Sequence, residues 1–133
     1  MSPTLEQLIA TLRHSWSGAT SYADSDWSAD NPARGQCVVS SLVVQDYLGG
    51  DLVRYAVKGD GIDEMHYCNM LDGGVLLDTT RSQYQAPVTF TLMPVDLKHY
   101  KSVREKRLDD DETRERYELL RQRVAARLAL IES

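Results

Sequence analysis

The chain has little cysteine, and this scarcity excludes the classes of protein that depend on many disulfides. Only Cys37 and Cys68 occur among its 133 residues, whereas small secreted domains are held together by several bridges. The first residues have no basic start and include Glu6, so we expect no secretory signal. We therefore expect reduced thiols and a cytoplasmic location, and a Cys37–Cys68 disulfide is the less favoured alternative.

Long apolar runs and an excess of basic residues are missing too. No stretch approaches the roughly 20 consecutive apolar residues of a membrane span. The formal net charge is −5, so the chain offers no basic field for nucleic-acid phosphates or an anionic membrane. Neither nucleic acid nor a membrane is therefore an expected partner.

What is present fits one ordinary α+β domain over residues 1–133, a length typical of a single domain. Helices are predicted over residues 4–16, 37–48, 96–107 and 111–131, and strands over 52–58, 66–71, 75–80 and 88–92. Residues 17–36 are predicted to be a loop, and residues 58–64 a turn or short loop. Because the strands follow one another along the chain, we expect a small antiparallel sheet.

The predicted helices differ in their apolar faces. Residues 37–48 are apolar on nearly all sides, which is typical of a central helix wrapped by the rest of a fold. The first helix has one apolar face, and Thr4 with Gln7 fits a capping box at its start. The last helix carries an apolar stripe that packs either on the domain or on a second copy, as a homodimer. The stripe consists of Tyr117, Leu120, Val124, Leu128 and Ile131.

Cys37, in the first turn of the predicted central helix, is the candidate nucleophile. The free N–H groups and dipole of a helix start stabilise a thiolate, and Gly35 allows a sharp turn just before it. His66 begins one hairpin strand and Asp78 lies near the end of the other. In a Cys–His–Asp set, the imidazole takes the thiol proton and the carboxylate orients the ring. The structural alternatives are a core cysteine, a packing histidine and a turn aspartate.

The hairpin between the two strands tests this hypothesis. A three-residue loop, Asp72-Gly73-Gly74, would pair Cys68 with Asp78 and set His66 on the same face as Asp78, one diagonal away. A two-residue loop would put the two side chains on opposite faces. The triad therefore requires the longer loop.

These motifs resemble known families. The GQC before an apolar helix, HYCNML, a glycine turn and VLLDTT resemble the core of the transglutaminase-like group of papain-like enzymes. That resemblance implies a papain-like fold with Cys37 as nucleophile, His66 as base and Asp78 as orienter. Five stretches are closer still to the YunG-like family of small bacterial proteins. They are SWSGATSY (15–22), DWSADNPARGQC (26–37), LVVQDYLGGDLV (42–53), HYCNMLDGG (66–74) and LDTTRSQY (77–84).

An acyl-transfer site also needs donors for the developing oxyanion. The backbone N–H of Cys37 is one candidate, and the resemblance to transglutaminases adds a tryptophan indole. The further candidates for the oxyanion hole or for substrate binding are Gln36, Trp27, Trp16, Arg81 and Asn69. The alternative for the two tryptophans is packing beneath the long loop.

The sequence thus predicts a thiol-dependent hydrolase or acyltransferase acting on an amide, isopeptide or thioester. Val38 stands where transglutaminases commonly have tryptophan, and no calcium site is recognisable, so crosslinking of proteins is not expected. No cofactor is implied, and no CxxC or HExxH spacing completes a metal site. The alternative is a binding or structural module without turnover.

Overall fold

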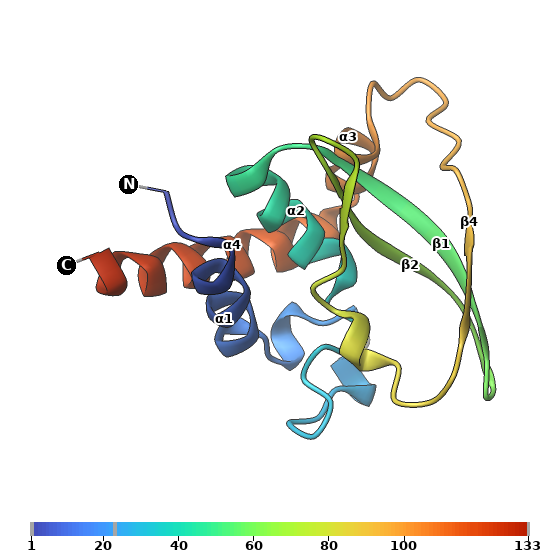
Figure 1. Ribbon diagram of the computed structural model, residues 1–133, viewed down its shortest axis with the longest axis horizontal. Coiled ribbons are helices and arrows are strands. Elements are labelled where there is room, and N and C mark those ends of the chain that lie inside the picture. Colours follow the sequence, from blue (N-terminus) through green and yellow to red (C-terminus); the bar gives the residue numbers. More distant parts are fainter. Residues whose placement is uncertain (1, 23, 133) are drawn as a thin grey trace.

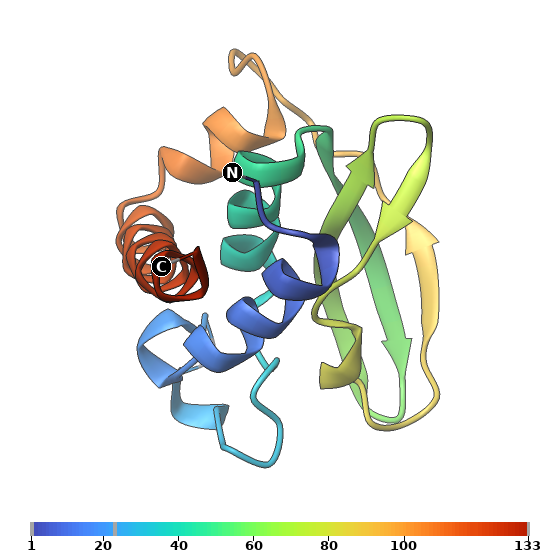
Figure 2. The same cartoon turned by 60° about the vertical axis from the view of Figure 1, so that its left-hand side comes forward.

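Helices lie along one side of a four-stranded sheet (Figure 1, Figure 2). This computed structural model describes residues 2–22 and 24–132. The helices are α1 (Leu5–Ser15), α2 (Cys37–Leu48), α3 (Val103–Leu108) and α4 (Asp111–Glu132). The strands are β1 (Asp51–Gly59), β2 (Ile62–Leu71), β3 (Val75–Leu77) and β4 (Thr89–Leu92). Short 3₁₀ turns cover Gly18–Thr20 (η1), Asp24–Asp26 (η2) and Arg81–Gln83 (η3). The predicted α+β class with an antiparallel sheet is confirmed.

The sheet is antiparallel with strand order β3-β2-β1-β4. β1 and β2 pair from Asp51↔Met70 to Gly59↔Ile62, which leaves only Asp60 and Gly61 as the turn. Both turn residues have positive φ, 50° and 81°, as a two-residue hairpin of type I′ requires. The turn or short loop predicted over 58–64 is therefore present, but it is only two residues long because the rest of the range belongs to the two strands.

The hairpin between β2 and β3 has the predicted three-residue loop. Leu71 pairs with Val75, and both loop glycines are in the left-handed region, Gly73 at φ 85° and Gly74 at 80°. The strand prediction for 75–80 is too long, since β3 ends at Leu77. Pairing of Cys68 with Asp78 does not form, and beside His66 the edge of β2 that faces β3 is open, while β1 pairs with the other edge at Tyr55.

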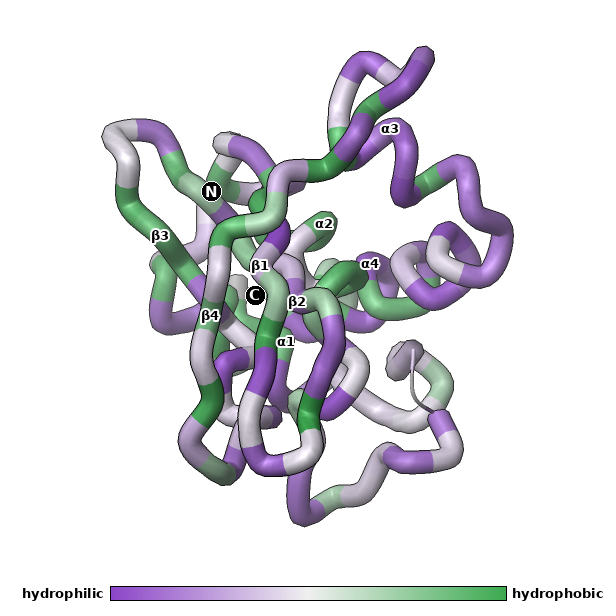
Figure 3. The backbone as a smooth tube through the Cα atoms, turned by 90° about the vertical axis from the view of Figure 1, so that its right-hand side faces the viewer, coloured by the Kyte–Doolittle hydropathy of each residue, from purple (hydrophilic) through white to green (hydrophobic). Residues whose placement is uncertain are grey.

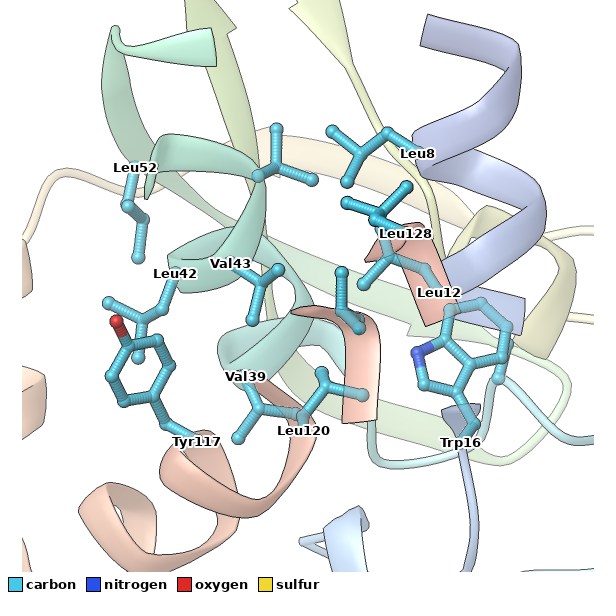
Figure 4. Close-up of a cluster of buried hydrophobic side chains, with 13 residues drawn as sticks. Leu8, Leu12, Trp16, Val39, Leu42, Val43, Leu52, Tyr117, Leu120 and Leu128 are labelled. Carbon is cyan, nitrogen blue, oxygen red and sulfur yellow. The ribbon is translucent and has the colours of Figure 1, made fainter. Parts of the chain in front are cut away.

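Helix α2 has its predicted bounds and lies at the centre of the molecule. A hydrogen bond from Asn69 Nδ2 of β2 to the Ser41 carbonyl oxygen, at 2.9 Å, ties it to the sheet. The core cluster around α2 takes side chains from both ends of the chain (Figure 4). Its members include Leu8, Leu12, Trp16, Val39, Leu42, Val43, Leu52, Tyr117, Leu120 and Leu128.

The apolar stripe of α4 packs on α1 and α2 of the same chain. Four of its five predicted residues, from Tyr117 to Leu128, are buried, while Ile131 is 51% exposed. Of the two alternatives for this stripe, the structure shows packing on the domain. None of the helices within the described residues is both long and apolar enough to cross a bilayer.

The helix predicted over residues 96–107 is much shorter. The carboxylate of Asp96 accepts the Lys98 N–H, and Lys98 has a φ of 53°, which a helix does not contain. The Ser102 hydroxyl then accepts the Glu105 N–H and caps α3. The turn at Asp96–Lys98 therefore delays the helix until Val103.

Candidate functional site

His66 and Asp78 meet at the edge of β2 that β3 leaves open. Asp78 directly follows β3, and its Oδ2 lies 2.7 Å from Nε2 of His66. Its other oxygen, Oδ1, accepts the Thr80 N–H at 3.2 Å. The His66 side chain is fully buried and that of Asp78 is 18% exposed. Both oxygens of the carboxylate are thus engaged, and the imidazole is held in one orientation.

Cys37 is the first residue of α2, and its side chain is half-buried. Gly35 turns the chain just before it with a φ of 75°, a conformation that glycine adopts without strain. The Cys37 thiol lies close enough to the His66 imidazole to raise the pKa of that ring. Since Nε2 of that ring bonds Asp78, Nδ1 is the nitrogen left for the sulfur. Neither Cys37 nor Cys68 is in a disulfide.

The surroundings raise the pKa of His66 to about 9. Burial is the largest influence and lowers the pKa, because desolvation disfavours the imidazolium. The hydrogen bonds with Asp78 and Cys37, together with the negative charges of both, raise it by more. The raised pKa favours the protonated, imidazolium form of the His66 ring at neutral pH.

Cys68 lies two residues along β2, on the same face as His66. It is 2% exposed. Burial, followed by the charges of Asp78 and Cys37, raises the pKa of its thiol to about 12. The thiol of Cys68 is accordingly protonated at neutral pH and is a poor nucleophile.

Comparison with known proteins gives the family of the chain. Residues 4–129 match the family model described as YunG protein. The chain belongs to the YunG family. A relative, named Uncharacterized protein YunG, from Bacillus subtilis (strain 168), is 34% identical over 90 residues, which cover 68% of this chain and 71% of the relative. No solved structure matches the chain. The resemblance to transglutaminase-like enzymes therefore rests on the motif residues alone.

Two residues of the YunG motifs have their donors engaged within the fold. Gln36 is fully buried, where its Nε2 donates to the Ser17 carbonyl oxygen at 2.9 Å and its Oε1 accepts from the Thr20 hydroxyl at 2.7 Å. Asn69 donates to α2, as described above, and is 1% exposed. These amides hold the loop over 17–36 and the sheet to α2.

The two tryptophans also hold the fold together. Trp16 is buried in the core, and its indole N–H donates to the Ser40 hydroxyl at 2.8 Å. The indole N–H of Trp27 donates to the Pro32 carbonyl oxygen at 2.9 Å, within the long loop. Since each indole has a single N–H, neither tryptophan has a donor left for an oxyanion in this conformation.

An ion pair fixes the segment that leads into Cys37. Nη1 of Arg34 lies 3.0 and 2.9 Å from the two carboxylate oxygens of Glu64 on β2. The Tyr84 hydroxyl donates to the same carboxylate at 2.9 Å. Arg34 therefore holds the segment before Cys37 against the sheet.

Gln83 and Tyr84 belong to the site, although the sequence analysis gave them no role. Nε2 of Gln83 lies 3.4 Å from Nδ1 of His66. The rings of Tyr84 and Phe90 contact His66 edge-on, with centroids 5.3 and 5.9 Å away. Both Gln83 and Tyr84 lie in the stretch LDTTRSQY, whose continuous likeness to the family pattern was the one signal that could have pointed to them.

Arg81 lies beside the site rather than in it. Its guanidinium carbon is 3.9 Å from the centre of the Phe90 ring, and it borders a pocket together with Asp78. In the part of the chain that the structure describes, no cluster of three histidine, cysteine or acidic residues could hold a metal ion.

Proposed function

We propose that this YunG family member is a thiol-dependent hydrolase or acyltransferase with a papain-like Cys37–His66–Asp78 triad. The observation that carries the proposal is the fixed His66 ring, bonded to Asp78 through Nε2 and close enough to the Cys37 thiol for that thiol to raise its pKa. A raised imidazole pKa supports a thiolate–imidazolium pair at neutral pH. The two reduced cysteines fit a reducing compartment such as the cytoplasm.

The chemistry follows from these positions. The Cys37 thiolate attacks the carbonyl carbon of an amide, isopeptide or thioester, and the carbonyl electrons move to oxygen. When the tetrahedral intermediate collapses, the leaving amine or thiol takes the proton of the His66 imidazolium. An acyl-thioester then remains on Cys37. Water, or an acceptor nucleophile, gives a proton to His66 as it attacks this thioester, which releases the product and restores the thiolate.

The backbone N–H of Cys37 is the first donor for the oxyanion. Among the described residues it has no hydrogen-bond acceptor, as is usual for the first N–H of a helix. It therefore remains available to a substrate oxygen close to the sulfur.

Gln83 is the second donor that we propose. Its Nε2 lies beside Nδ1 of His66, and its two contacts, to that nitrogen and to the Thr80 hydroxyl, are both long at 3.4 Å. A donor held so weakly can turn to a stronger acceptor such as an oxyanion.

Acylation by p-nitrophenyl acetate tests the proposed nucleophile. We expect a burst of p-nitrophenolate and an acetyl adduct on the Cys37 peptide, identified by mass. Cys68→Ser should keep the burst, whereas Cys37→Ser and His66→Gln should abolish it. Acetylation of both cysteines at equal, slow rates would contradict the proposal.

Gln83→Ala separates oxyanion stabilisation from thiol activation. We expect acylation to slow on the order of 10²-fold. Alkylation of Cys37 by iodoacetamide should change little, because that reaction forms no oxyanion. Equal losses in both reactions would show that Gln83 acts only by positioning His66.

The complete burial of the His66 ring favours one other function. A buried imidazolium–carboxylate pair packed against Tyr84 and Phe90 is also suited to a binding module that keeps the fold without turnover. In that case the acylation experiment would give no Cys37 adduct, although the folded protein would be unchanged.

A further inference from the structure

The sheet forms a pocket on the face that turns away from α2. The pocket has a volume of about 410 Å³ and is lined by Tyr55, Cys68, Leu76, Phe90, Asp78 and Arg81. Each of the four strands contributes one of the first four side chains. The pairing register sets these four on one face, and Asn69, whose side chain reaches α2, on the other.

No helix covers this face of the sheet in Figure 2. In Figure 3 the strands lie in front and the helices behind them. The wall of the pocket is mostly apolar, with two aromatic rings and Leu76, which is 48% exposed. Pockets of about 300–1,000 Å³ with apolar walls and few polar groups are typical sites for small molecules. The volume therefore fits a small ligand rather than a protein surface.

Arg81 supplies the available charge of the pocket. Its guanidinium lies over the Phe90 ring, a contact that uses the flat face of the group and leaves its N–H donors, which lie in the plane, free to bind. Within the described residues, no carboxylate pairs with Arg81. The acid in the wall, Asp78, already has its two oxygens engaged by His66 and Thr80.

We propose that this pocket binds a small carboxylic acid with a flat apolar body. Arg81 pairs with the carboxylate through two N–H donors, and the body contacts Tyr55, Leu76 and Phe90. A single negative charge fits better than a phosphate dianion, because Asp78 borders the pocket and Arg81 is its one cation. Asp78 lines the pocket and Phe90 contacts His66, so the pocket borders the proposed triad. Cys37 does not line it, so binding does not require the sulfur.

Titration with 3-phenylpropionate, followed by ¹H–¹⁵N NMR of the full chain, tests this assignment. We expect saturable shifts that include the amides of Tyr55, Cys68 and Leu76. Arg81→Gln should weaken binding at least about tenfold, as expected for a charge-assisted pair, and Arg81→Lys less. Because Arg81 is exposed, both variants should fold, which their own spectra will show.

Two matched probes supply the controls. The neutral 3-phenylpropanamide and the ringless propionate should each bind at least about tenfold more weakly than 3-phenylpropionate. Equal binding of the acid and the amide, no effect of Arg81→Gln, or no saturable shift with any probe would overturn the proposal. Cys37→Ser should bind 3-phenylpropionate like the wild type, so failure of the thiol chemistry and failure of this pocket are distinguishable.

Discussion

Two opposite influences act on the pKa of the His66 imidazole. Burial disfavours its charge, yet the bonds to Asp78 and Cys37 favour that charge more, and the pKa rises from 6.5 to about 9. Such a shift is also a contribution to stability, because the folded state holds a proton that the unfolded state releases at lower pH. The proposed base of the triad therefore also stabilises the fold.

This coupling predicts how stability changes with pH. For a group whose pKa is raised in the folded state, the stabilisation is complete below the unfolded pKa and is lost as pH rises through the folded one. We expect the free energy of unfolding in urea to fall by about 2–3 kcal/mol between pH values of about 6 and 9.

His66→Gln is the control for the pH experiment, and its free energy of unfolding should vary much less over this range. The range ends near pH 9 because ionisation of Cys68 in the unfolded state begins to matter above it. A wild-type curve as flat as that of His66→Gln would contradict the assignment of the raised pKa to this ring.

Among the elements, the loop over residues 17–36 depends on one buried side chain. Gln36 both donates to the Ser17 carbonyl oxygen and accepts from Thr20. Gln36→Ala would leave both buried partners unsatisfied, so we expect a loss of about 2–3 kcal/mol in the free energy of unfolding. Limited proteolysis should then cut first between residues 17 and 36.

Gln85→Ala is the matched control for Gln36, because Gln85 is exposed and its one hydrogen bond, to the Asp30 carbonyl oxygen, is long at 3.4 Å. This variant should lie within about 0.5 kcal/mol of the wild type. If Gln36→Ala kept its stability and lost acylation instead, Gln36 would be an oxyanion donor and not an anchor.

The elements also show how far sequence reasoning reaches. The all-round apolar pattern of residues 37–48 and the Gly73-Gly74 loop predicted α2 and the hairpin register, because both depend on local chemistry. The turn predicted within 58–64 is confirmed at Asp60-Gly61, a dipeptide typical of two-residue hairpins, but it is shorter than the predicted range. His66 and Asp78 are in contact, but not as diagonal neighbours of two paired strands. Instead β3 ends at Leu77, and Asp78 turns to the open edge of β2.

Long-range packing explains the rest of what could not be predicted. The position of β4 beside β1, and of Gln83 and Tyr84 beside His66, depends on how the chain returns over the sheet after β3. No periodic pattern of residues in the sequence predicts this path of the chain. In the same way, the donors of Gln36, Trp16 and Asn69 are engaged by groups far along the chain, which sequence position alone does not show.

For the molecule as a whole, α4 joins the two ends of the chain. Its buried stripe packs on α1 and α2, and Arg123 of α4 donates to the Ser15 carbonyl oxygen and the Ser17 hydroxyl at 3.0 and 2.7 Å. The C-terminal helix therefore completes the core that supports the start of α2.

Truncation of a buried stripe residue tests this role. Leu120 is fully buried, so Leu120→Ala should lower the free energy of unfolding by about 2–5 kcal/mol. Ile131→Ala, at the exposed end of the same helix, should change it by no more than about 0.5 kcal/mol. Equal, small effects in urea denaturation would mean that α4 does not belong to the cooperative core.

The central claim, that His66 and Asp78 activate the Cys37 sulfur, is tested most directly by site-resolved alkylation. Iodoacetamide would be added at about pH 7, and the labelling rates of Cys37 and Cys68 followed by peptide mass. We predict that Cys37 reacts much faster than Cys68, that His66→Gln removes this advantage and that Asp78→Asn reduces it. Slow labelling of Cys37 that is unchanged by His66→Gln would contradict the account.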